Sequence, residues 1–194
     1  LFVWIPEKKA LFPGDNFYKT FPNLYTIRGT PYRDLAGWVN SIDMMRYLEP
    51  EYLIPSHTRP LEGRANIYNK LTTYRDGIQY VHDQTVRLMN LGLGPDEIAE
   101  KLILPKHLGD SPFLKEFYGS PSWSAKNVFS GYLGWFDGNP STLKPLPKKK
   151  EAENFIKLVG GWDNLFEIAE SSYKEGGFQW ALQLTDHLLR LRPN

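Results

Sequence analysis

Asp15 and His57 are the residues of this sequence whose type and position best suit chemistry. Asp15 comes just after the short apolar segment Ala10–Phe12, which predicts a strand. His57 likewise follows a second predicted strand, Tyr52–Ile54. Loops at strand ends commonly carry ligands and catalytic groups, and carboxylate and imidazole are both zinc ligands. The two residues are therefore candidate ligands of one metal site, although an aspartate in a turn by itself more often stabilises the turn.

The other three histidines, His82, His107 and His187, have no comparable setting. No two histidines are spaced to bind one metal through a short motif. We expect His82 on a helix surface, His107 in a polar loop, and His187 near a helix end, where positive charge is favourable. The sequence has no cysteine, which excludes thiolate ligands, a thiol nucleophile and disulfides, and favours a periplasmic or secreted location over a cytoplasmic one.

The composition sets broad limits on the class of protein. The chain has 194 residues, of which 41% are hydrophobic, so it can bury a substantial core. Its 23 basic and 22 acidic residues leave a formal net charge of +1, which gives no support for a nucleic-acid partner. No apolar run approaches the roughly 20 residues that a membrane span needs, so we expect no such span.

Residues 1–60 have the pattern of mixed strands and helices. Besides the strands named above, Phe2–Ile5 predicts a strand joined to Ala10–Phe12 by a polar turn. A helix is expected from about Asp34 to Leu48, because its apolar residues recur at steps of three and four. The sequence opens inside a predicted strand and without methionine, so we expect it to be part of a longer polypeptide.

From about Leu61 the pattern becomes helical. One long helix is expected to carry an apolar stripe with coiled-coil-like spacing, made of Ile67, Leu71, Tyr74, Ile78, Val81, Thr85 and Leu88. Further helices are expected at 95–102, 122–136, 151–159, 162–174 and 179–190. We therefore expect an α+β protein with two domains, residues 1–60 and an all-helical domain of residues 61–194.

Several segments resemble a known enzyme family. Leu11–Asp15 followed by Pro55–His57 resembles the last two metal motifs of metallo-β-lactamase-fold hydrolases. Further segments resemble the alkylsulfatases of that superfamily, namely Asn23–Gly29, Tyr74–Asp76 with His82–Thr85, Tyr118–Ser120, and Gly131–Pro140. The similarity extends over essentially the whole chain in the family's order.

This resemblance implies a fold, an activity and roles for particular residues. Residues 1–60 would be a short α/β remnant of a metallo-β-lactamase αββα domain, followed by the helical dimerisation domain of the alkylsulfatases. Asp15 and His57 would be zinc ligands and Arg28 would contact the sulfate group of the substrate, as a guanidinium can donate two hydrogen bonds to an oxyanion. The complete enzyme would be a homodimer that uses two zinc ions to hydrolyse primary alkyl sulfate esters to alcohol and sulfate.

Some features depart from the family pattern. Many alkylsulfatases have glutamate where this chain has Asp15, and some have a histidine in the stretch that is Pro121–Ser124 here, which puts a histidine role there in doubt. The His-x-His-x-Asp-His motif is absent, so we expect zinc to be absent or only partly bound and this chain alone to be inactive. Two alternatives stay open: a non-catalytic helical dimerisation or interaction module, and a different hydrolase of the same fold, such as a glyoxalase or a lactonase.

Overall fold

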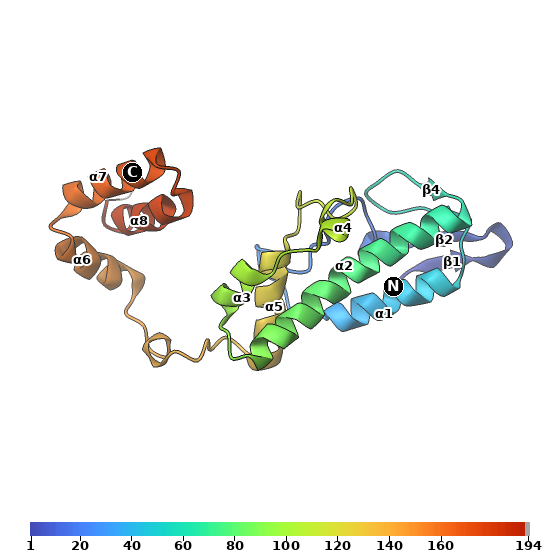
Figure 1. Ribbon diagram of the computed structural model, residues 1–194, viewed down its shortest axis with the longest axis horizontal. Coiled ribbons are helices and arrows are strands. Elements are labelled where there is room, and N and C mark those ends of the chain that lie inside the picture. Colours follow the sequence, from blue (N-terminus) through green and yellow to red (C-terminus); the bar gives the residue numbers. More distant parts are fainter. Residues whose placement is uncertain (193–194) are drawn as a thin grey trace. The chain divides into compact units, whose positions relative to one another are not determined.

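The computed structural model describes residues 1–192, which form two compact units that divide between Gly138 and Asn139. Figure 1 shows the helices and strands of both units along the chain. Within the described residues, no helix is both long enough and apolar enough to cross a membrane.

A small mixed sheet organises the start of the first unit. Its strands, in spatial order, are β1 (Val3–Ile5), β2 (Ala10–Phe12), β3 (Tyr52–Leu53) and β4 (Leu61–Glu62). The outer pairs β1–β2 and β3–β4 are antiparallel, whereas β2 and β3 are parallel. Because parallel strands end at the same edge of a sheet, the loops that follow β2 and β3 begin next to each other.

Helices make up the rest of the first unit. They are α1 (Leu35–Tyr47), α2 (Arg64–Asn90), α3 (Pro95–Lys101), α4 (Lys106–Gly109) and α5 (Pro121–Leu133). The helix α1 begins where the Asp34 carboxylate accepts a hydrogen bond from the Ala36 amide, and it lies along α2 (Figure 1). All seven residues of the predicted apolar stripe on α2 are buried, against α1 and α5 of the same chain. Their burial is as expected, but it needs no second copy of the chain.

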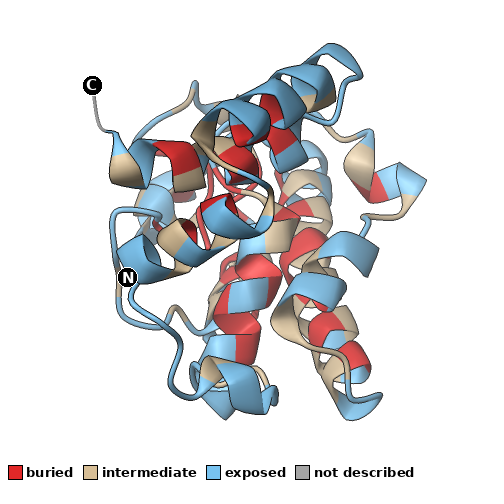
Figure 2. Cartoon of the chain, turned by 90° about the vertical axis from the view of Figure 1, so that its left-hand side faces the viewer, coloured by how far each residue is buried: buried red, intermediate tan, exposed pale blue. Residues whose placement is uncertain are grey.

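The second unit contains the helices α6 (Lys148–Leu158), α7 (Trp162–Lys174) and α8 (Phe178–Leu191). The helices α7 and α8 form a hairpin that turns at Gly176, whose φ of 85° favours glycine. A small cluster of apolar residues forms the core of this unit: Ile156, Leu165, Ala169, Leu184 and Leu188. Figure 2 shows that buried residues occupy one stripe of each helix, with exposed residues on the other side.

The α+β class expected from the sequence is confirmed, and several local predictions are corrected. The strand β4 was not expected, since Leu61–Glu62 reads as the start of a helix that in fact begins at Arg64. His107 lies in the short helix α4 rather than in a loop. The helix α5 ends at Leu133 because Gly134 has a φ of 83°, so Trp135 and Phe136 lie outside it. The compact units do not divide near residue 60, because α2 packs directly on α1; the assignment of residues 1–60 and 61–194 as domains stays a prediction.

Candidate functional site

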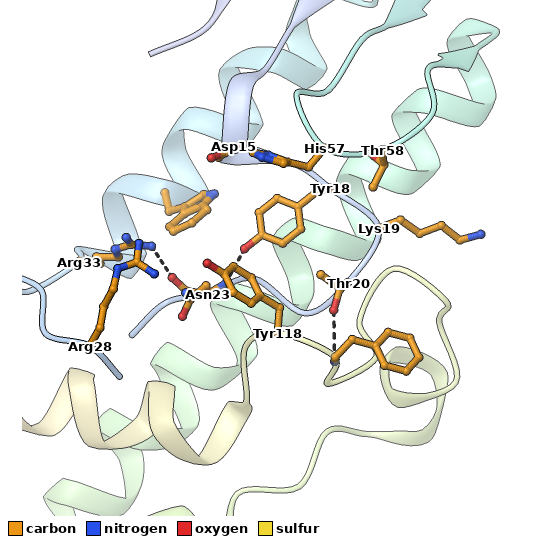
Figure 3. Close-up of a pocket in the computed structure, with 12 residues that line it drawn as sticks. Asp15, Tyr18, Lys19, Thr20, Asn23, Arg28, Arg33, His57, Thr58 and Tyr118 are labelled. Carbon is orange, nitrogen blue, oxygen red and sulfur yellow. Dashed lines mark hydrogen bonds and ion pairs between the residues drawn. The ribbon is translucent and has the colours of Figure 1, made fainter. Parts of the chain in front are cut away.

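One pocket of about 470 Å³ collects the residues that the sequence pointed to. Asp15, Arg28 and His57 all line it, and Figure 3 shows their side chains around the same space. The walls come from four parts of the first unit: the loops after β2 and β3, the irregular segment between residues 17 and 34, the helix α1, and a loop before α5. The other lining residues are Tyr18, Lys19, Thr20, Asn23, Arg33, Trp38, Thr58, Phe117 and Tyr118.

Asp15 and His57 point toward each other at one side of the pocket (Figure 3). The Nδ1 atom of His57 lies 2.6 Å from the Oδ1 atom of Asp15, and both side chains are about two-thirds exposed. The parallel pairing of β2 and β3 explains the contact, because it starts both loops at the same edge of the sheet. The structure therefore brings the two predicted metal ligands together.

The turn that carries Asp15 is held from two directions. The indole Nε1 of Trp38, on α1, donates a hydrogen bond to the Asn16 carbonyl at 3.0 Å. The Asn16 side chain in turn donates to the Leu1 carbonyl at 3.1 Å. Gly14 precedes Asp15 with a φ of 59°, a conformation that costs glycine little. These bonds fix the carboxylate without burying it, so its oxygens remain available to a ligand.

As a metal site, the pair is incomplete. A carboxylate and an imidazole are suitable zinc ligands, and their mutual approach suits one shared centre. Among residues 1–192, however, no group of three or more His, Cys, Asp or Glu side chains could hold a metal ion. The donor set therefore fits two ligands of a larger site rather than a complete zinc site.

A cluster of hydrogen-bond donors lies beside this pair. The Arg33 Nη1 donates to the Asn23 carbonyl at 2.5 Å, and the Tyr118 hydroxyl is within hydrogen-bonding reach of the Asn23 and Arg28 side chains. Hydrogen bonds from Asn23 and then Arg28 lower the pKa of Tyr118, and the charges of Arg28 and Arg33 act in the same direction. The two arginines and the Asn23 amide on this side of the pocket are suited to a negatively charged group.

Tyr18 also lines the pocket and contacts Asn23. Its hydroxyl accepts a hydrogen bond from the Asn23 amide at 2.6 Å. Burial raises the pKa of Tyr18, so the phenol stays neutral at working pH. The Asn23 backbone is thus held on both sides, by Tyr18 at its N–H and by Arg33 at its carbonyl.

Asn23, Arg33 and Tyr118 are site residues that the sequence did not identify as such. Asn23 and Tyr118 do lie in segments singled out for their family resemblance, but nothing local shows that they meet. They meet because Gly119 comes very close to the chain at Pro22: a Cβ at residue 119 would lie 2.1 Å from the Pro22 carbonyl oxygen. The signal in the sequence was therefore the glycine after Tyr118, which permits this approach.

The remaining histidines do not line this pocket. His82, on α2, bonds Asp83 through Nδ1 and the Tyr132 hydroxyl through Nε2, each at 2.7 Å. His187 lies in the second unit, where its ring stacks on Phe155 at 4.6 Å between centroids. His82 lies on the helix α2 as expected, but its ring is largely covered, whereas the charge effect expected for His187 stays a prediction.

Comparisons with known proteins identify relatives over nearly the whole chain. A family model described as alkyl sulfatase dimerisation matches residues 94–194. A linear primary-alkylsulfatase of a Pseudomonas species is 40% identical over 191 residues, covering 97% of this chain and 36% of the relative. The alkyl/aryl-sulfatase BDS1 of Saccharomyces cerevisiae is 32% identical over 197 residues, covering 100% of this chain and 30% of the relative.

Solved structures of alkylsulfatases also resemble this chain. The stereoselective inverting sec-alkylsulfatase Pisa1 from a Pseudomonas species superposes with a TM-score of 0.93 at 30% identity, covering 97% of this chain and 30% of that chain. The present chain spans about a third of the length of the curated relatives it matches.

Proposed function

This chain belongs to the alkylsulfatase family, and from that premise we propose that it is part of a zinc-dependent hydrolase that cleaves primary alkyl sulfate esters to alcohol and sulfate. The observation that carries this proposal is the shared pocket, in which a pair of suitable metal ligands lies beside a cluster of anion-binding donors. A sulfate ester presents both an anionic group to bind and a bond to hydrolyse.

The donor cluster suits the sulfate group. Arg28 is exposed and always charged, and its planar guanidinium can donate two hydrogen bonds to a tetrahedral oxyanion. Its neighbours Asn23 and Tyr118 add uncharged donors, and Arg33 adds a second positive charge. In the proposed reaction these groups bind the sulfate and stabilise charge that develops on its oxygens.

Asp15 and His57 would hold zinc in the proposed enzyme. Bound zinc supplies a water of lowered pKa and positive charge near the ester. A working site needs more ligands than these two, so we propose that residues outside the present sequence complete it, as the His-x-His-x-Asp-His motif does in the metallo-β-lactamase fold. Within this chain, Trp38 keeps the Asp15 turn in place, and the Asp15–His57 contact keeps both donors at one side of the pocket.

We further propose a homodimer, in line with the dimerisation family that matches residues 94–194. In the second unit, the helices α7 and α8 leave a groove of about 680 Å³ lined mainly by apolar side chains. Phe178 and Leu182 are more than 60% exposed there, which is unusual for apolar residues gathered on one face. We propose that this face packs against the second copy.

Hydrolysis by the intact gene product that contains this chain tests the proposed activity. Sulfate release from dodecyl sulfate should depend on bound zinc and be abolished by a chelator, with a secondary alkyl sulfate and an alkyl phosphate as comparison substrates. Arg28→Ala should raise KM for dodecyl sulfate by about a hundredfold, as expected for a lost charge-assisted pair. A zinc-loaded, folded protein that releases no sulfate from dodecyl sulfate would overturn the proposal.

A non-catalytic dimerisation module is the second candidate. The absence of a complete ligand set among residues 1–192 favours it. It predicts a dimer that binds neither zinc nor sulfate esters, so the same measurements separate the two functions.

A further inference from the structure

The loop that carries Arg28 has no regular secondary structure, and its internal side-chain bonds, from the Asn23 amide to Tyr18 and from Arg33 to the Asn23 carbonyl, hold Asn23 rather than Arg28. Residues 17–34 contain no helix or strand beyond turns, and Arg28 lies at an exposed position within them. The backbone hydrogen bond nearest to Arg28 joins residues close in sequence, from the Gly29 amide to the Thr26 carbonyl at 2.9 Å. A guanidinium that must meet a substrate in one geometry needs its loop held by other parts of the fold.

Asn127, a buried residue of α5, ties together two points of this loop that lie on either side of Arg28. Its side-chain amide lies 3.1 Å from the Leu24 carbonyl and 3.2 Å from the Arg33 carbonyl. A side-chain amide nitrogen has two hydrogens, so it can donate to both carbonyls at once. Asn127 is only 6% exposed, which makes the loss of these bonds costly.

A second contact comes from the next turn of the same helix face. Gly131 lies four residues after Asn127, and a Cβ there would lie 2.3 Å from the ring of Tyr32. The ring of Tyr32, the residue before Arg33, therefore packs directly against the α5 backbone. Asn127 and Gly131 together hold the loop to α5 at Leu24 on one side of Arg28 and at Tyr32 and Arg33 on the other.

We propose that α5 holds the substrate loop and that Asn127 is a positioning residue for Arg28. This inference rests on the proposed function, in which Arg28 binds the sulfate group. Its consequence is that a helix within the segment matched by the dimerisation model also sets the geometry of the substrate pocket. The segment matched by the dimerisation model would then serve the substrate pocket through α5, in addition to the association proposed for α7 and α8.

The test uses Asn127→Ala in the intact gene product. We expect KM for dodecyl sulfate and the inhibition constant of inorganic sulfate to rise about tenfold, since a displaced binding group loses affinity, while zinc content stays unchanged. Ser124→Ala is the matched control, because Ser124 is buried one turn earlier in α5 and its hydroxyl donates to the carbonyl of Ser120, the residue that caps this helix. The control should leave both constants unchanged.

A double mutant separates positioning from general stability. If Asn127 acts through Arg28, adding Asn127→Ala to Arg28→Ala should change KM no further. Independent, additive effects would overturn the inference, as would an unchanged KM in Asn127→Ala. An unchanged KM in Arg28→Ala would overturn both the role of Arg28 in the proposed function and this inference.

A second variant covers a failure of Asn127→Ala to fold. Gly131→Ala changes an exposed helix position, and its new methyl group would displace the Tyr32 ring. We expect a rise in KM of a few fold, with zinc content unchanged, that again disappears in the Arg28→Ala background. A Gly131→Ala protein with wild-type KM and sulfate inhibition would contradict the inference.

Discussion

The two compact units bury their apolar side chains to very different extents. In the first unit, one cluster extends from the sheet through α1 and α2 to α5, and large side chains such as Phe17 and Tyr74 are fully buried. In the second unit, the core consists of a few residues between α6, α7 and α8. Phe178 and Leu182 of that unit remain more than 60% exposed.

This difference indicates which unit is stable without a partner. A unit of fewer than about 70 residues rarely gains more than a few kcal/mol from its core, so an uncovered apolar face is a further cost. The first unit has a large core and a pocket with polar side chains held in place by the fold. The second unit has a small core and an exposed apolar face, so we expect association with a second copy to stabilise it. We expect chemistry in the first unit and association in the second.

The largest effect expected is the loss of activity when the metal pair is broken. In the intact gene product, Asp15→Ala or His57→Ala should lower kcat/KM by about a thousandfold or more, because the zinc site would lose a ligand. Zinc content should fall in parallel. Both side chains are about two-thirds exposed, so the free energy of unfolding of the zinc-free protein should change little.

Thr58→Ala is the control, because Thr58 lines the same pocket beside His57 but has no ligand group of the zinc type. Full zinc content and full activity in both Asp15→Ala and His57→Ala would contradict the assignment of these residues as zinc ligands and the expectation that the first unit carries the chemistry.

The next effect concerns the two cores. Leu71→Ala in α2 and Leu184→Ala in α8 each remove a fully buried side chain, which typically costs about 3 kcal/mol of unfolding free energy. Hydrogen exchange measured by mass spectrometry should show lost protection in α1, α2 and α5 for Leu71→Ala, and in α6–α8 for Leu184→Ala. Equal loss of protection in both units for either variant would break the comparison.

A smaller effect is expected at the exposed face of the second unit. Leu182→Glu should leave the folding of α7 and α8 intact, because the side chain is 63% exposed. It should raise the dimer dissociation constant about 10- to 100-fold, since a charge would be buried at the proposed interface. Sedimentation at several concentrations measures this, with Lys174→Glu as a charge control on the same hairpin. An unchanged dimer dissociation constant would show that the interface does not include this face of α7 and α8.

The sequence predicted regular elements well and tertiary contacts poorly. The α2 stripe followed from apolar spacing alone, whereas the approach of Asp15 and His57 was expected from the family resemblance together with their positions at strand ends. In contrast, the strand β4 has two residues, too few for any period to appear. The meeting of Asn23 with Tyr118 depends on Gly119 touching Pro22, and the support of the Arg28 loop depends on Asn127. Such contacts join distant segments through single atoms, and no local pattern encodes them.

The smallest effect expected is the titration of Tyr118, which reports the electrostatics of the first unit's pocket. Its pKa lies below the usual value of about 10, first because Asn23 and then because Arg28 donates hydrogen bonds that favour the phenolate. Because the pKa is depressed on folding, any stability gained is present above the unfolded-state pKa. It is lost as the pH falls through the folded-state pKa.

The difference in phenolate absorbance between the wild type and Tyr118→Phe should therefore show a tyrosine that ionises at lower pH than the others. Asn23→Ala should move that transition to higher pH more than Arg28→Lys does, since the Asn23 bond is the larger cause and lysine keeps the charge. A difference spectrum with an ordinary tyrosine transition would mean that the pocket does not favour anions, and the contrast with the second unit would then rest on packing alone.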